Sequence, residues 1–162
     1  MTVCFTGHRP QSLSFGFDES HPDCVDLKNR LFEAIGKLIE QGADTFYSGM
    51  ALGIDTFAAE AVLRYKKENP KIRLIAAIPC PNQAKSWNED AKERYKTILE
   101  ACDQQIVVSP YYHRGCMHER NRFMADNSDV LIAVYDGSEK GGTAYTVNYA
   151  KKKGLDVIII QP

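Results

Sequence analysis

The chain has 162 residues, of which 44% are hydrophobic and 25% charged, the size and composition of one globular domain with a substantial core. Its formal net charge of −1 gives no overall attraction to nucleic acid, so composition makes nucleic acid an unlikely partner. No apolar run approaches the roughly 20 residues that span a bilayer, and the N-terminus has no signal-type apolar segment, so no membrane partner is expected.

The cysteines and histidines predict neither a disulfide framework nor a metal site. Five cysteines is an odd number, and no two of them form a Cys-x-x-Cys pair. Reduced thiols are typical of the cytoplasm, which is the predicted location. His113, Cys116 and His118 are three metal-ligating side chains close together in the sequence, but their spacing matches no familiar zinc pattern.

The N-terminal part of the chain predicts a strand followed by a helix. Residues 2–6 form a β-rich run, and the turn at residues 7–10 ends in a proline that cannot continue a strand. Residues 11–23 show no periodic pattern and are expected to be irregular. Apolar residues then recur at helical spacing over residues 25–41, and Gly42 is placed to cap the C-terminus of that helix.

Residues 45–60 form the unit around which the rest of the chain is organised, a strand, a glycine loop and a helix that begins at Ile54. Gly49 and Gly53 lie at the junction, where the lack of a Cβ allows a tight turn and close approach to a bound group. The first turn of a helix presents unpaired N–H groups, which suit a phosphate or carboxylate. We therefore predict that Ser48, Gly49, Gly53 and Asp55 contact an anionic ligand. A capped strand-to-helix turn without a ligand is the alternative.

The remaining pattern alternates strands with helices. Strands are predicted at residues 72–78, 105–109, 130–134 and 157–160, and helices at residues 86–102, 118–127 and 144–153. This alternation predicts a single-domain α/β fold, a Rossmann-like parallel sheet with helices on both faces. Ligands of such sheets bind beyond the carboxyl ends of the strands, so the loops at those ends should converge on one edge.

Two of these loops carry further candidate ligand-binding residues. Gly141, Gly142 and Thr143 precede a predicted helix and repeat the anion-binding logic of the first glycine loop, although threonine is also an ordinary N-cap residue. Gly7, His8 and Arg9 lie in the turn after the first strand, and Asp136 follows the strand at residues 130–134. These polar side chains contact either a ligand or another part of the protein.

Two segments resemble a known family. Residues 4–10 (CFTGHRP) and 48–55 (SGMALGID) resemble the conserved loops of the YpsA-like proteins, a branch of the SLOG superfamily. This superfamily is named for the DNA-processing protein DprA (SMF) and the LOG phosphoribohydrolases, which share a Rossmann-like domain. Residues 48–55 are similar to the serine-glycine loop of DprA, and residues 117–120 (MHER) resemble the Met-His-x-Arg motif of LOG enzymes. The likeness extends over essentially the whole chain and implies a nucleotide-type ligand.

The resemblance to LOG enzymes is incomplete. In those enzymes the arginine of the Met-His-x-Arg motif, matched here by Arg120, acts with a glutamate in a Pro-Gly-Gly-x-Gly-Thr-x-x-Glu motif to cleave an N-glycosidic bond. The corresponding residues 140–147 (KGGTAYTV) contain no glutamate after the threonine. Cleavage through an oxocarbenium-like species normally requires a nearby carboxylate. Asp55, Glu119 or Asp136 could replace it only if the fold brings one of them to the sugar.

The leading hypothesis is therefore a nucleotide-binding protein, with a sensor as one option for its role, whose ligand is a nucleoside phosphate, ADP-ribose or an NAD-like molecule and which requires no cofactor. The first alternative is a LOG-like phosphoribohydrolase with Arg120 as its catalytic residue. The second is a DprA-like binder of single-stranded DNA. The resemblance also implies a homo-oligomer, because relatives associate through their helices.

Overall fold

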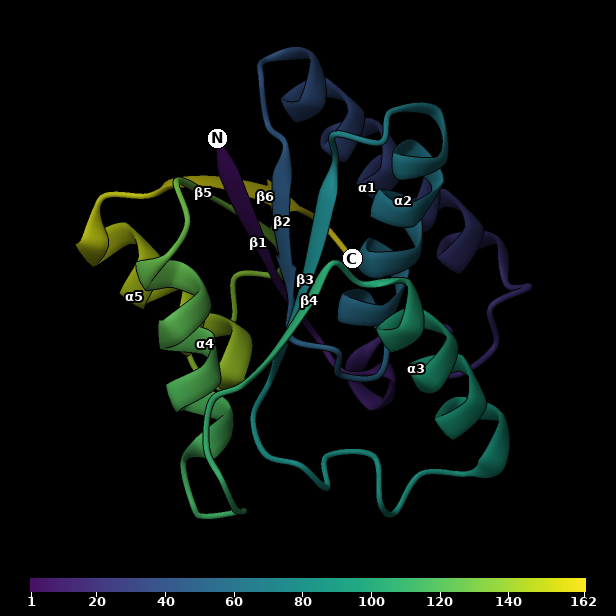
Figure 1. The fold of residues 1–162 in the computed structure, drawn as a ribbon, viewed down its shortest axis with the longest axis vertical. Helices are drawn as coiled ribbons and strands as arrows, with labels where there is room; N and C mark the ends of the chain where they lie inside the picture. The colour runs from purple at the N-terminus through teal and green to yellow at the C-terminus, as the bar shows by residue number, and fades with distance from the viewer.

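Six parallel strands form one sheet at the centre of the computed structural model, which describes residues 1–162 (Figure 1). In chain order the strands are β1 (Thr2–Gly7), β2 (Thr45–Ser48), β3 (Arg73–Ile78), β4 (Gln104–Val107), β5 (Val130–Val134) and β6 (Asp156–Ile160). Their order across the sheet is β4-β3-β2-β1-β5-β6. The chain thus builds outward from β1 to β4 and then returns to place β5 on the other side of β1. The direction of building reverses between β1 and β5, the position where such sheets bind ligands.

Helices cover both faces of the sheet (Figure 1). On one face lie α1 (Pro22–Glu40), α2 (Ile54–Glu68) and α3 (Glu89–Ala101), and on the other lie α4 (Cys116–Asp126) and α5 (Gly142–Lys153). Right-handed crossovers explain this division, because the connections change face when the direction of strand addition reverses. None of these helices has the length and apolar character that crossing a membrane requires.

The core consists of two layers separated by the sheet. The larger layer packs Phe5 and Phe46 of the sheet against Leu27 and Leu31 of α1. The smaller layer includes Leu131 of β5 and residues of α4 and α5. All five residues of β5 are buried, as expected for a central strand of a parallel sheet that is covered on both faces. The predicted fold class is therefore confirmed.

Local capping explains where the predicted helix boundaries differ from the structure. The first helix starts at Pro22 because the His21 ring accepts a hydrogen bond from the Asp23 N–H at 3.1 Å and proline suits the first helical position. The third helix starts at Glu89, after Asn88 caps it, so Trp87 precedes this helix although the predicted helix began at residue 86. The predicted irregular segment contains a short 3₁₀ helix, Pro10–Ser12.

Candidate functional site

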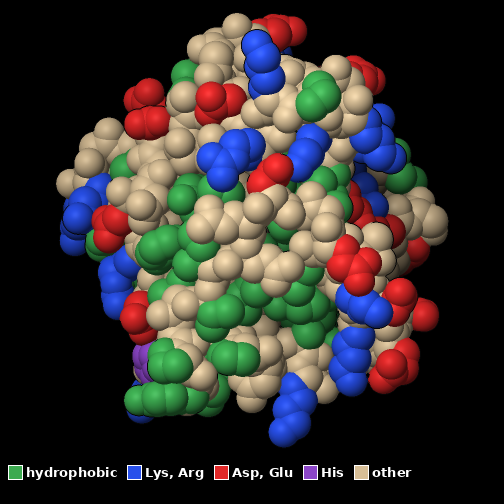
Figure 2. Space-filling view, in the orientation of Figure 1, with side chains coloured by type: hydrophobic (Ala, Val, Ile, Leu, Met, Phe, Trp, Pro, Cys, Tyr) green, Lys and Arg blue, Asp and Glu red, His purple; other side chains and the backbone are tan.

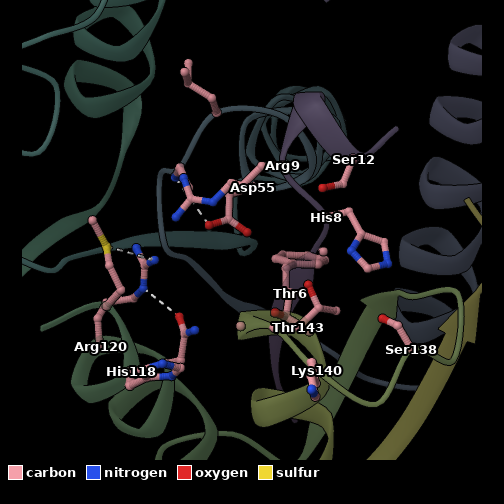
Figure 3. A pocket seen from close by; sticks show the side chains of 18 of the residues that line it. Thr6, His8, Arg9, Ser12, Asp55, His118, Arg120, Ser138, Lys140 and Thr143 are labelled. Carbon is pink, nitrogen blue, oxygen red and sulfur yellow. Dashed lines mark hydrogen bonds between the residues drawn. The ribbon is translucent and has the colours of Figure 1, made fainter. Parts of the chain in front are cut away.

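A cavity of about 370 Å³ lies at the carboxyl ends of β1 and β5, where the direction of strand addition reverses. Figure 3 shows side chains from four segments arranged around it. The predicted residues that line it are Gly7, His8, Arg9, Asp55, Arg120, Asp136, Gly141, Gly142 and Thr143. This volume is in the range of small-molecule sites.

Three helices begin at this cavity, and none has a side-chain cap. The N-cap residues of α2, α4 and α5 are Gly53, Gly115 and Gly141, each with a positive φ of 87°, 91° and 107°. The helices that begin elsewhere, α1 and α3, are both capped by a side chain. The missing caps therefore coincide with the cavity. The first turns of α2 and α4 carry the acidic residues Asp55 and Glu119, whereas the first turn of α5 carries none, so the positive end of the α5 dipole is the one left open to a ligand.

The start of α5 is the most open of the three. Tyr145 is the first residue of this helix whose N–H donates to a protein acceptor, the Gly141 carbonyl at 3.0 Å. The N–H groups of Gly142 and Thr143, which line the cavity, have no protein acceptor. No acidic residue lies in the first turn of the helix. These free donors and the helix dipole suit an anion.

Two cations at the cavity have no ion-pair partner. Arg9 and Lys140 are exposed residues that line the cavity, and neither forms a salt bridge. Figure 3 shows Lys140 beside Thr143, near the start of α5. Sequence reasoning missed Lys140, although its place directly before Gly141 was a usable signal.

His8 and Asp136 tether two of the cavity loops to each other. The Nε2 atom of His8 lies 3.1 Å from Oδ1 of Asp136 and accepts a hydrogen bond from the Asp136 N–H at 3.3 Å. Hydrogen bonds from Ser138, with the nearby His8, lower the pKa of Asp136. His8 and Asp136 therefore contact each other, which is the alternative to ligand contact that the sequence left open. The carboxylate keeps about half of its side-chain surface exposed, at 51%.

Arg120 is almost enclosed by the protein, with 2% of its surface exposed. Its Nη1 donates to the Gly49 carbonyl and, at 3.5 Å, to the Ala77 carbonyl, while Nε donates to Oδ1 of Asn121 at 2.8 Å. Burial lowers the pKa of the guanidinium, and the Asp55 carboxylate acts in the opposite direction. Arg120 thus joins α4 to the loop after β2 and to strand β3, and only its edge reaches the cavity.

Ser48, Gly49 and Gly53 support the cavity wall and do not line the cavity. The Ser48 hydroxyl donates to the Asp55 carbonyl at 2.9 Å and accepts from the Met50 N–H at 3.2 Å. A Cβ on Gly49 would lie 2.5 Å from Nη1 of Arg120 and 2.7 Å from Oδ2 of Asp55. The two charged groups therefore face each other across space that only glycine leaves open. Glycine is therefore required at position 49 by packing, whereas its spacing from Gly53 had suggested ligand contact.

The histidines of the α4 region do not gather with other ligating side chains. His113 Nε2 lies 3.0 Å from Glu119 Oε2, and Glu119 does not line the cavity. His118 does line it, packs against Tyr145 with the ring centroids 4.2 Å apart, and leaves its buried Nδ1 without a partner. No group of three or more His, Cys, Asp or Glu side chains is arranged to hold a metal ion.

The architecture and the cavity define a Rossmann-like α/β protein whose switch point carries the free N-terminus of α5 and unpaired cations. The model of the YpsA family, described as the YspA SLOG family, matches residues 3–159, so the chain belongs to this family. A UPF0398 protein of Halalkalibacterium halodurans is 30% identical, over 99% of this chain and 87% of the relative. A UPF0398 protein of Bacillus cereus strain G9842 is 32% identical, over 94% and 83%. The family predicted from the loops is confirmed.

Two solved structures of DprA share the fold. The Streptococcus pneumoniae protein superimposes with a TM-score of 0.67 at 20% identity, over 99% of this chain and 50% of that one. The Helicobacter pylori protein, whose structure describes a single-stranded DNA binding mode, gives 0.65 at 20% identity, over 100% and 66%. The chain thus spans half to about two thirds of these proteins.

The likeness to DprA contradicts the expectation that nucleic acid is an unlikely partner, because a protein with this fold binds single-stranded DNA. Net charge was the wrong criterion. It averages over the whole surface, whereas a strand is held by local cations and free N–H groups.

Proposed function

We propose that the protein binds a nucleotide or nucleotide derivative, such as a nucleoside phosphate, ADP-ribose or an NAD-like molecule, and acts as a sensor of it. The observation that carries the proposal is the uncapped start of α5, whose free Gly142 and Thr143 N–H groups line a cavity at the switch point. A phosphate placed there meets the helix dipole and the unpaired Lys140 and Arg9 side chains.

The proposal is binding without cleavage of a glycosidic bond. Glu119, one of the three candidate replacements for the LOG glutamate, faces His113 and not the cavity. Asp55 accepts from the Ala51 N–H at 3.2 Å and lies beside Arg120, and Asp136 accepts from the Ser138 N–H at 2.9 Å. Both carboxylates already accept hydrogen bonds from the protein backbone, which disfavours either one as a base that activates water.

Isothermal titration calorimetry with AMP, ADP-ribose, NAD and ribose 5-phosphate tests this proposal. We expect at least one of these ligands to bind, and Lys140→Met to weaken its binding about fivefold to tenfold, the usual effect of losing one charge-assisted contact. Lys152→Met, at the opposite end of α5, is the matched control and should leave the affinity unchanged. The absence of binding by all four ligands would refute the proposal.

A second candidate function is binding of single-stranded DNA, favoured by the shared DprA fold. The segment after β4 carries Tyr111 and Tyr112, 69% and 67% exposed, and flat exposed rings can stack with bases. Figure 2 shows hydrophobic side chains gathered on the face that β4 presents to the viewer. This function predicts a mobility shift of a thymine oligonucleotide that weakens steeply with salt and on Tyr112→Ala. Unchanged mobility at low salt would exclude it.

Cytoplasmic location and homo-oligomerisation complete the proposal. All five cysteines are free thiols, which suits a reducing compartment. Light scattering of the purified protein measures the oligomeric state, and a mass equal to one chain would contradict the oligomer.

A further inference from the structure

A second hollow adjoins the cavity and differs from it in chemistry. It has a volume of about 530 Å³ and shares Leu52 with the cavity. Pro10 and Gly53 also line this hollow, and each directly follows a cavity residue in the chain, Arg9 and Leu52 respectively. These two residues are in close contact, because a Cβ on Gly53 would lie 3.1 Å from Cδ of Pro10. Four aromatic side chains line it, which define what we name the aromatic hollow: Phe17, Phe57, Trp87 and Tyr95.

The aromatic rings present both a rigid wall and an open face. Trp87 and Tyr95 pack edge to face with centroids 5.3 Å apart, and burial raises the pKa of Tyr95 to about 12. Phe57 is buried at the base of the hollow, while Phe17 is 66% exposed. Trp87 is half-buried, so part of its ring system remains free for a partner. A planar ring is the kind of group that such surfaces bind.

Arg94, the one cation that lines the hollow, is already paired with carboxylates. Arg94 binds Glu19 through Nη1 at 2.5 Å and Glu60 through Nε at 2.6 Å, and Lys28 lies 2.5 Å from Glu19. Both cations are paired and the Asp90 carboxylate that lines the hollow has no salt-bridge partner, so the hollow offers no unpaired positive charge to a phosphate. The cavity has the opposite character, with free cations and the free N-terminus of α5.

The cavity in turn offers little apolar surface to a nucleobase. Only four of its 19 lining residues are hydrophobic, so its lining is mainly polar. The single aromatic ring among those four, Phe5, has no exposed surface. Bases bind by stacking on flat rings, and the aromatic hollow supplies four of them, whereas the other rings at the cavity are the imidazoles of His8 and His118.

We propose that the aromatic hollow is the base-binding subsite of the nucleotide site, so that one ligand crosses Leu52 with its phosphate at α5 and its base against Trp87. This inference rests on the proposed function and adds the prediction that the base contributes to affinity. A bound sugar phosphate without a base would leave the hollow empty.

Trp87 is the only tryptophan of the chain, so its fluorescence reports on this hollow alone. We expect AMP to quench Trp87 emission with the same midpoint that calorimetry gives, and ribose 5-phosphate to bind more weakly without quenching. Free N-acetyltryptophanamide corrects for absorption of light by AMP. Trp87→Ala should weaken AMP about tenfold or more, in line with the loss of one stacked base, and leave ribose 5-phosphate unchanged.

Two further variants keep the test decisive. Trp87→Phe retains a flat ring and should retain most of the AMP affinity, and Phe17→Ala changes an exposed ring that the core does not need. Equal binding of AMP and ribose 5-phosphate, without quenching and with no effect of Trp87→Ala or Phe17→Ala, would overturn the subsite and leave the proposed function standing. Failure of both ligands to bind would overturn the proposed function and the subsite together.

Discussion

Arg120 is expected to act mainly on stability, and Arg120→Met tests this expectation. Methionine keeps much of the apolar volume of the side chain and removes the guanidinium. The substitution leaves the Gly49 and Ala77 carbonyls without their Arg120 donor and takes the opposing charge away from Asp55. Because the side chain is 2% exposed, water cannot easily replace these contacts.

The expected loss in the free energy of unfolding is about 3–5 kcal/mol. Each hydrogen bond lost from Arg120 costs roughly 1 kcal/mol, although the Gly49 carbonyl keeps a hydrogen bond from Nε2 of Gln83 at 3.2 Å, and the buried Asp55 carboxylate that loses the nearby guanidinium accounts for the rest. The loss should be partly recovered in the double variant Arg120→Met/Asp55→Asn, because the remaining carboxylate is then neutralised. Its cost should therefore be smaller than the sum of the two single variants.

Urea unfolding followed by circular dichroism measures these differences. Arg122→Met is the matched control on the same helix, since Arg122 donates only to the Tyr145 hydroxyl at 2.7 Å, and it should lose less than about 1 kcal/mol. A loss below about 1 kcal/mol for Arg120→Met, equal to that of Arg122→Met, would refute the structural role derived from the burial of Arg120.

Three further predictions follow from single positions. Gly142→Ala should keep or raise the free energy of unfolding by up to about 1 kcal/mol, since a Cβ there meets nothing within 4 Å, yet weaken ligand binding in calorimetry by adding a methyl group beside the free N–H groups. Gly7→Ala should destabilise by about 1–3 kcal/mol in urea because its Cβ would lie 2.4–2.7 Å from Ile54 atoms, and Ile54→Ala should recover part of the loss. Burial alone would raise the pKa of Glu19, but hydrogen bonds from Arg94 and Lys28 outweigh it and lower the pKa to about 2. This carboxylate therefore stabilises the fold above its higher unfolded pKa, and thermal unfolding should show the difference between wild type and Glu19→Gln vanish as the pH falls from about 5 to about 2.

The fold could be predicted because each element leaves a local signal. The buried run at β5 and the helical spacing of α2 follow directly from the residues that face the core. Boundaries were less accurate where a cap decides them. Pro22 starts its helix through its fixed φ, and Asn88 starts the other through a side-chain hydrogen bond. Hydrophobic periodicity detects neither feature.

The site could be predicted only in part, because a motif does not say which way a residue faces. The glycines at 141 and 142 line the cavity, whereas Gly49 serves to make room for Arg120. Both are glycines in a strand-to-helix loop, and only the packing of α4 against the loop after β2 distinguishes them. Lys140 and Trp87 were missed as site residues because each matters through its neighbours in space.

At the position of the missing LOG glutamate the structure has a hydrogen-bonded side chain without a carboxylate. Thr146, three residues after Thr143, stands where that motif has its glutamate, and its hydroxyl donates to the Gly142 carbonyl at 2.8 Å and accepts from Asn121 at 3.0 Å. Thr146 is 2% exposed, so this position belongs to a closed network without a carboxylate that also reaches Arg120 through Asn121. The proposed binding of phosphate at α5 would use backbone N–H groups and would not depend on the side chain at this position. Threonine here is therefore compatible with the proposed binding and supplies no carboxylate for cleavage.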